Sequence, residues 1–167
     1  MATRGKKMTI SVGERLPRAD FVKATPDGPQ PVEGQEYFAG RRIALFSVPG
    51  AFTPTCSARH LPGFIEKVDQ LKAKGVDEVA CTAVNDAFVM QAWADQAGAG
   101  GKVTMLADGN GAFAEAIGLT MDGSKFGLGK RGQRWSMIVN DGVVEELNVE
   151  EPGAYNVSSA DYMLSRL

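Results

Sequence analysis

The chain has 167 residues, and its 18 Lys and Arg residues are nearly balanced by 20 Asp and Glu residues, which leaves a net charge of -2. This length favours one domain, and a hydrophobic content of 44% is enough to build a core. A charged fraction of 23% excludes a disordered polyelectrolyte, and without clustered excess base we expect no nucleic-acid partner. The apolar runs fall short of the roughly 20 residues that span a bilayer, so we expect no membrane partner.

The first residues are basic and have no apolar segment behind them, so they do not resemble a secretory signal. We expect residues 1–7 to form a flexible extension and residues 8–167 to form a single domain. The chain has two cysteines, Cys56 and Cys81, and one histidine, His60. These are too few for a disulfide framework or a Cys/His zinc site, so we expect free thiols, a cytoplasmic location and no metal.

The first predicted element is a hairpin loop at the Pro- and Gly-rich residues 25–31. Residues 42–48, RIALFSV, form a continuous apolar run of strand length, which predicts a buried central strand. Apolar residues then recur at helical spacing over residues 61–71, which predicts a helix. Pro62 and Gly63 inside that pattern predict a kink or a break.

The rest of the chain alternates between predicted strands and helices. In order, we expect a strand at 79–84, a helix from an Asn85-Asp86 cap to Ala97, a strand at 103–106, a short helix at 110–117, a cationic glycine-rich loop at 123–133, strands at 135–140 and 143–149, and a terminal helix opened by a capping box at 158–161. Asp141-Gly142 between the last two strands is a strong hairpin signal. Because right-handed crossovers make the first strands parallel, we expect an α/β, thioredoxin-like fold with a central mixed sheet flanked by helices.

Cys56 follows the first buried strand after a proline-rich turn, at or near the start of a helix. Unsatisfied N–H groups and the positive end of the helix dipole favour a thiolate there, and the thiolate is the nucleophilic form of cysteine. Thr53 has a hydroxyl that can accept from a backbone N–H or bond to a molecule docked at the sulfur. Pro49 and Pro54 stiffen the loop and shield the sulfur. Position alone leaves an inert cysteine as the alternative.

The pattern Pro49-x-x-x-Thr53-x-x-Cys56 resembles the active-site motif of the peroxiredoxins. The longer run VPGAFTPTCSARHLPGF resembles the type II, or peroxiredoxin V-like, subfamily. Three more segments are similar to that subfamily in the same order, namely VNDAFVMQAW, GLGKRGQRWSM and the hairpin that ends in ELNVEEPG. The resemblance covers nearly the whole chain from about residue 8, and it implies a thiol peroxidase without metal, flavin or haem.

The resemblance also assigns roles to individual residues. It implies that the Cys56 thiolate attacks the O–O bond of hydrogen peroxide or an alkyl hydroperoxide and becomes a sulfenic acid. The Thr53 hydroxyl and the Cys56 N–H would bind the peroxide oxygens, and Pro49 would shield the sulfur. Arg134 matches the family's arginine beside the sulfur, which stabilises the thiolate, and Arg131 is the nearby competitor for that position.

Two residues keep alternative interpretations. His60, one helical turn after Cys56, either assists the thiol or the reductant, or is a packing residue. Cys81 lies in a predicted buried strand and is either structural or a resolving cysteine, although a disulfide to Cys56 would require the helix start to unwind. Other members of the subfamily resolve through a cysteine near the C-terminus, but residues 156–159 contain none. This favours a one-cysteine cycle in which glutathione with glutaredoxin, or thioredoxin, reduces Cys56.

A thiol redox sensor or interaction module, which uses the oxidation of Cys56 as a signal, is the main alternative to an enzyme. Fast turnover with a recycling reductant separates the two. A disulfide oxidoreductase is disfavoured because residues 56–59 lack the second cysteine of a Cys-x-x-Cys motif. The family commonly forms homodimers through surfaces near the active site, and the apolar Phe52 is a candidate for such an interface.

Overall fold

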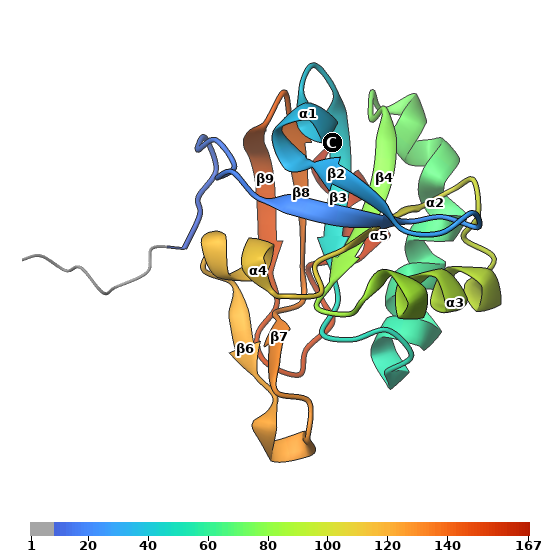
Figure 1. Ribbon diagram of the computed structural model, residues 1–167. Coiled ribbons are helices and arrows are strands. Elements are labelled where there is room, and N and C mark those ends of the chain that lie inside the picture. The colour runs from blue at the N-terminus through green and yellow to red at the C-terminus, as the bar shows by residue number, and fades with distance from the viewer. Residues whose placement is uncertain (1–8) are drawn as a thin grey trace, which may run out of the picture.

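A seven-stranded mixed sheet forms the centre of the molecule, and helices cover both of its faces (Figure 1). The computed structural model describes residues 9–167, so the predicted extension, residues 1–7, lies outside the described residues. The strands are β1 Asp20–Ala24, β2 Gln30–Glu33, β3 Arg42–Ser47, β4 Glu78–Ala83, β5 Thr104–Ala107, β6 Thr120–Asp122, β7 Lys130–Gly132, β8 Trp135–Asn140 and β9 Val143–Val149. The helices are α1 Gly34–Phe38, α2 Leu61–Ala73, α3 Ala87–Ala97, α4 Ala112–Ala116 and α5 Ala160–Arg166, with a π-helical turn η1 Cys56–His60 and a 3-10 turn η2 Ser124–Phe126.

The strand order of the central sheet is β2-β1-β5-β4-β3-β8-β9. β3, β4 and β5 pair in parallel, whereas β8 is antiparallel to β3 and β1 is antiparallel to β5. The hairpin loop predicted within residues 25–31 joins β1 to β2, and the Asp141-Gly142 turn joins β8 to β9. The predicted α/β architecture, with parallel central strands and an antiparallel hairpin at one edge, is confirmed.

The two faces of β3 show why the central strands are apolar throughout. Ala44 and Phe46 belong to the core cluster that α2, α3 and α5 cover, whereas Ile43 and Leu45 belong to the cluster under α1 and α4. Successive residues of a strand point to opposite faces of the sheet. Because helices cover both faces, all four residues are fully buried, and the strand reads as a continuous apolar run.

The helices that flank the candidate site begin where the sequence predicts. α2 continues from η1 without a break, because His60 and Leu61 both have right-handed helical φ and ψ values, so the break predicted at Pro62 and Gly63 is absent. The helix instead contains the π-helical turn η1 directly before α2. Asp86 caps α3 as predicted, because its carboxylate accepts the Val89 N–H at 2.8 Å. Within residues 9–167, no helix is long and apolar enough to cross a membrane.

Two details differ from the sequence prediction. The expected loop at 123–133 contains η2 and β7, and β7 pairs with β6 in a small second sheet. Its strands are only three residues long, which is too short to show an alternating pattern. The cap of α5 is Ser159, which accepts the Tyr162 N–H at 3.0 Å, because Ser158 is buried and its hydroxyl donates to Glu150.

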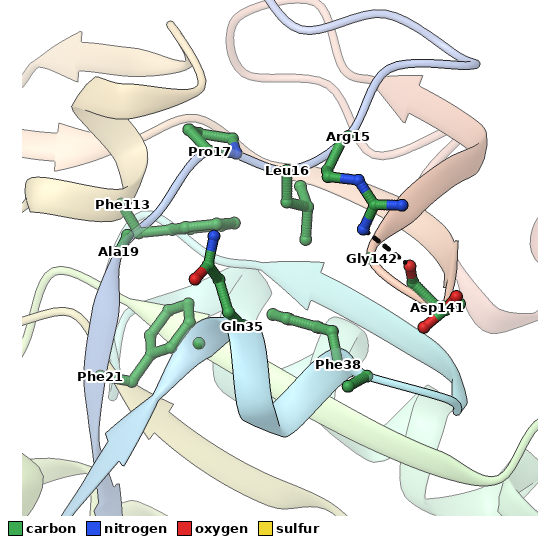
Figure 2. A pocket seen from close by; sticks show the side chains of 12 residues that line it. Arg15, Leu16, Pro17, Ala19, Phe21, Gln35, Phe38, Phe113, Asp141 and Gly142 are labelled. Atoms are coloured by element: carbon green, nitrogen blue, oxygen red, sulfur yellow. Dashed lines mark hydrogen bonds between the residues drawn. The ribbon is translucent and has the colours of Figure 1, made fainter.

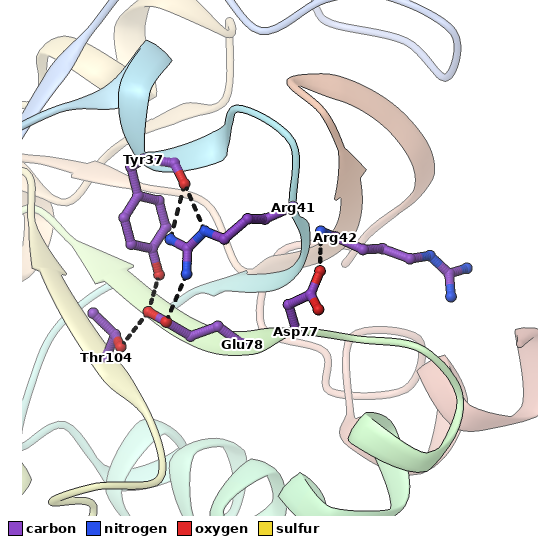
Figure 3. A network of polar contacts seen from close by, with 6 residues as sticks. All are labelled: Tyr37, Arg41, Arg42, Asp77, Glu78 and Thr104. Carbon is purple, nitrogen blue, oxygen red and sulfur yellow. Dashed lines mark hydrogen bonds and ion pairs between the residues drawn. The ribbon is translucent and has the colours of Figure 1, made fainter.

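A polar network joins α1 to the amino ends of β4 and β5, at the end of the sheet away from Cys56 (Figure 3). Glu78 accepts hydrogen bonds from Tyr37, from Arg41 at 2.9 Å and from Thr104 at 2.6 Å. Burial alone would raise the pKa of Glu78, but these hydrogen bonds hold it below its usual range. The network therefore anchors one end of the parallel strands, and the loops at their carboxyl ends carry the candidate site.

Candidate active site

Cys56 lies beyond the carboxyl end of β3, where the chain leaves the sheet through Pro49 and Gly50 and enters a continuous helix. Its thiol is buried in the first turns of that helix, where free backbone N–H groups and the helix dipole favour an anion. Arg134 Nη2 donates to the Cys56 sulfur at 3.1 Å, across a sequence separation of 78 residues. The structure thus places the positive charge of Arg134 in hydrogen-bond contact with the Cys56 sulfur.

Strand pairing explains how Arg134 reaches the sulfur. Arg134 directly precedes β8, and β8 pairs with β3 so that Trp135 lies opposite Ser47. The arginine is therefore beside the point where β3 ends and the loop to Cys56 begins. Its carbonyl accepts the Glu150 N–H at 3.0 Å, and its guanidinium carbon lies 5.9 Å from the centre of the Tyr155 ring. These contacts fix Arg134 from behind.

His60 lies behind the arginine and is fully buried. Its Nε2 lies 2.9 Å from the Ser158 carbonyl oxygen, which can only accept, so Nε2 carries the proton. The unprotonated Nδ1 then accepts a hydrogen bond from Arg134 Nη1 at 2.8 Å. Burial lowers the pKa of His60 to about 3, and the charge of Arg134 acts in the same direction. The imidazole is therefore neutral at physiological pH.

Thr53 shapes the loop between β3 and Cys56. Its hydroxyl donates to the Gly50 carbonyl at 2.7 Å, so the lone pairs of its oxygen remain able to accept a hydrogen bond. The loop is tied to the start of α3, because the Ala51 N–H donates to Asn85 Oδ1 at 2.9 Å. Phe52, at the tip, has a φ of 65°, in the left-handed region that non-glycine residues rarely adopt.

The comparisons with known proteins agree with this geometry. A family model described as Redoxin matches residues 11–164. The chain is 52% identical over 164 residues to Peroxiredoxin-2E-2, chloroplastic, from Oryza sativa subsp. japonica, which covers 95% of this chain and 73% of the rice protein. It is 41% identical over 170 residues to Peroxiredoxin sll1621 from Synechocystis, with 92% and 89% of the two chains covered. The chain belongs to the peroxiredoxins.

A solved peroxiredoxin has the same fold. The crystal structure described as reduced Prx3 in complex with H2O2 from Vibrio vulnificus is 49% identical, has a TM-score of 0.90, and covers 95% of this chain and 99% of that chain. The predicted thioredoxin-like fold and the resemblance to type II peroxiredoxins are confirmed. As a peroxiredoxin, the protein is a thiol-dependent peroxidase, an oxidoreductase that acts on peroxide.

The two candidate arginines have different partners in this peroxiredoxin. Arg134 contacts the sulfur of Cys56. Arg131 Nε donates to the Leu128 carbonyl at 3.0 Å, and its Nη1 donates to the Pro49 carbonyl at 3.2 Å. Arg131, the competitor suggested by the sequence, is therefore bonded to the loop and not to the thiol.

A groove of about 630 Å³ opens beside Arg134, between the β6–β7 hairpin and the loop that follows β9. Its lining includes Pro49 and Arg134, whose guanidinium contacts the Cys56 sulfur, and the apolar side chains of Met121, Phe126 and Pro152. A second, smaller cavity of about 100 Å³ lies against α1, far from Cys56 (Figure 2).

Cys81 lies on β4, directly opposite Phe46 of β3, and belongs to the same core cluster as Cys56. Both thiols are free and buried. Burial, together with the neighbouring Cys56 thiol, raises the pKa of Cys81 well above its ordinary value. The Cys81 thiol is therefore protonated in this conformation. Within residues 9–167, no group of three His, Cys, Asp or Glu side chains could hold a metal ion.

Sequence reasoning missed the support that Glu150 gives to the site. The carboxylate accepts the N–H groups of Asn156, Val157 and Ser158 and the Ser158 hydroxyl, all at 2.7–2.9 Å. Burial alone would raise the pKa of Glu150, but these donors hold it below its usual range. The ionised carboxylate thus fixes the loop whose Ser158 carbonyl binds His60. The only sequence signal was that Glu150 lies in the family-like segment ELNVEEPG.

We predict that His60 stays neutral down to pH values well below 6.5. Because the unfolded chain takes up a proton on His60 near pH 6.5 and the native chain does not, this residue should lower the free energy of unfolding as pH falls from about 6.5 to about 3. The expected slope is about 1.4 kcal/mol per pH unit. Denaturant unfolding at several pH values, with His60→Gln as the reference, measures the slope. Imidazole NMR signals that titrate near pH 6.5 in the folded protein would contradict the prediction.

Proposed function

We propose that Cys56 is the peroxidatic cysteine, which reduces hydrogen peroxide and alkyl hydroperoxides. The observation that carries this assignment is the hydrogen bond from Arg134 to a buried sulfur at the start of a helix. The thiolate sulfur attacks one peroxide oxygen, so that an S–O bond forms while the O–O bond breaks. The other oxygen leaves with the bonding electron pair, takes a proton from solvent and departs as water or alcohol. Cys56 becomes a sulfenic acid, which completes the two-electron oxidation of sulfur.

The loop supplies groups that can bind the peroxide. The Thr53 hydroxyl gives its proton to the Gly50 carbonyl, so its oxygen can accept the O–H of the attacked peroxide. The Cys56 N–H lies in the first turn of the helix and can donate to a peroxide oxygen. Donors and acceptors that are already oriented lower the barrier, because they need no rearrangement as charge develops. Pro49 adjoins the groove and shields the sulfur from other contacts.

We infer a supporting role for His60. A neutral imidazole that accepts from Arg134 and donates to Ser158 holds the guanidinium in place. Since its pKa is about 3 and its Nδ1 lone pair is directed at Arg134, it has no means of removing the thiol proton. His60 therefore orients the charge that stabilises the thiolate.

We propose a one-cysteine cycle in which an external thiol reduces the sulfenic acid. Burial of Cys81 and the raised pKa of its thiol support a structural role for this residue. Ser158 and its neighbours provide no cysteine in the C-terminal loop. Glutathione with glutaredoxin, or thioredoxin, is the proposed reductant, and alkyl hydroperoxides would place their substituent in the groove. The cytoplasmic location stays a prediction, and two relatives carry the word chloroplastic in their names.

Replacing Cys56 tests the assignment of the nucleophile. Cys56→Ser should abolish the consumption of hydrogen peroxide, because an alcohol is almost entirely protonated at neutral pH and is a poor nucleophile. The assay follows peroxide in the presence of glutathione and glutaredoxin, and separately with thioredoxin and its reductase. Cys81→Ser is the matched control and should keep most of the turnover. Activity retained by Cys56→Ser would disprove the assignment.

The mass of the protein after one equivalent of hydrogen peroxide tests the one-cysteine cycle. A gain of about 16 Da at Cys56 is expected, because the sulfenic acid waits for an external thiol. A loss of about 2 Da within the monomer would instead reveal a Cys56–Cys81 disulfide and a dithiol cycle. Peptide mapping after dimedone trapping locates the oxidised sulfur, and unreacted protein treated with dimedone is the control.

We also propose that the protein forms a homodimer through the exposed rings of Phe52 and Phe88. Phe52 is part of the loop of residues 48–55 between β3 and Cys56, which we call the catalytic loop, and Phe88 lies beside it. Phe52 and Phe88 are 47% and 72% exposed, and the Ala51–Asn85 hydrogen bond places their two segments side by side. Phe88→Asp should shift sedimentation from dimer to monomer, because the charge would be buried without a partner. Phe126→Asp, at a residue 77% exposed on the β6–β7 hairpin, is the control and should remain dimeric. A monomeric wild-type protein at micromolar concentration would refute the proposal.

A further inference from the structure

Arg131 connects two parts of the molecule that meet at the catalytic loop. It lies on β7, and its Nε donates to the Leu128 carbonyl of its own hairpin at 3.0 Å. Its Nη1 reaches across 82 residues to the Pro49 carbonyl at 3.2 Å. One guanidinium therefore ties the segment that enters the catalytic loop to the small β6–β7 sheet.

Gly50 shows how closely the guanidinium packs on the loop. A Cβ atom added at Gly50 would lie 2.7 Å from Arg131 Nη1 and 3.1 Å from Thr53 Cγ2. Gly50 is not among the glycines with a positive φ, so its backbone does not require glycine. A side chain at position 50 would therefore displace the end of the Arg131 side chain and press on Thr53.

The two hydrogen bonds at this segment act on successive carbonyl groups. Arg131 holds the Pro49 carbonyl, and the next carbonyl, that of Gly50, accepts the Thr53 hydroxyl at 2.7 Å and the Thr53 N–H at 3.3 Å. A rotation at Gly50 would move the acceptor of the Thr53 hydroxyl and thereby turn its lone pairs. The carbonyl that Arg131 binds is therefore one residue away from the carbonyl that orients the Thr53 hydroxyl.

We propose that Arg131 is a positioning residue that orients the Thr53 hydroxyl toward bound peroxide, an inference that rests on the proposed function of Cys56 and Thr53. The two arginines have different roles. Arg134 stabilises the thiolate by contact with the sulfur, whereas Arg131 sets the geometry of the group that binds the oxidant. The fork of the guanidinium matters, because one side chain must bond two carbonyls in different directions, which a lysine ammonium on a flexible stem does poorly.

The test compares two reactions of the same thiol. The rate of Cys56 with hydrogen peroxide depends on the thiolate and on peroxide binding, whereas alkylation by iodoacetamide depends on the thiolate and on access. Arg131→Gln and Arg131→Lys should each lower the peroxide rate by about tenfold to a hundredfold, since misplacement of a binding group by about 1 Å has effects of this size. Both variants should keep the alkylation rate and its pH dependence.

Lys130→Gln is the matched control. It removes one positive charge from the same strand, where Lys130 pairs with Glu115 at 3.3 Å on the surface, and it should change neither rate. A general loss of structure in the Arg131 variants would lower the unfolding temperature and change both reactions of Cys56 together. Wild-type peroxide rates in Arg131→Lys, or equal changes in both reactions, would overturn the proposal.

A double-mutant cycle tests whether Arg131 acts through Thr53. Thr53→Val keeps the shape of the side chain and removes the hydroxyl, so a further Arg131→Gln change should have little additional effect on the peroxide rate. Multiplicative effects of the two substitutions would show that Arg131 acts by another route and would overturn the inference. Peroxide reduction by Cys56→Ser would instead overturn the proposed function itself, so the two failures are distinguishable.

Discussion

The contact between Arg134 and the Cys56 sulfur is the interaction around which the site is organised. The Arg134 guanidinium donates a hydrogen bond to the buried sulfur at 3.1 Å, and a positive charge in contact with a thiol favours its anionic, nucleophilic form. The antiparallel pairing of β8 with β3 supplies the approach, because it carries the residue before Trp135 to the end of β3. Sheet register therefore determines the electrostatics of the thiol.

A series of hydrogen-bonded groups on the side of Arg134 away from the sulfur restricts the orientation of its guanidinium. Glu150 fixes the loop at Ser158, Ser158 binds His60, and His60 binds Arg134. Each group in this series is satisfied by hydrogen bonds, as buried polar groups must be. The C-terminal loop, which carries no cysteine, thus contributes to the site by rigidity and not by redox chemistry.

Much of the fold can be predicted from the sequence, and the reason is physical. Helices cover both faces of β3 and β4, so these strands have continuous apolar sequences. The start of α3 can be predicted because Asp86 is a typical N-cap residue. By contrast, β2 forms the edge of the sheet and has no buried residue, and its neighbour β1 buries only Phe21. β6 and β7 are only three residues long, so burial imposes no clear pattern on these four strands. Apolar patterns and capping residues therefore predict elements that are buried or capped. They do not predict elements whose pairing depends on tertiary contacts.

The same distinction holds for the site. Pro49, Thr53 and Cys56 are neighbours in the chain, so a motif can identify them. Arg131 and Arg134 are only three residues apart, and the family resemblance favoured Arg134. The register of β8 gives the physical reason, because it carries Arg134 to the end of β3, where it meets the sulfur. The contribution of Glu150 depends on a loop fold that no periodicity encodes.

Phe52 combines a strained backbone with a partly exposed aromatic side chain at the tip of its loop. A non-glycine residue in the left-handed region costs about 1 kcal/mol, and a glycine at the tip of the loop would relieve that strain. The chain nevertheless keeps a large aromatic side chain there, and 47% of that residue remains exposed to solvent. The chain therefore carries backbone strain at a residue whose side chain is only partly buried and whose ring lies 6.5 Å from that of Trp93, measured between ring centroids.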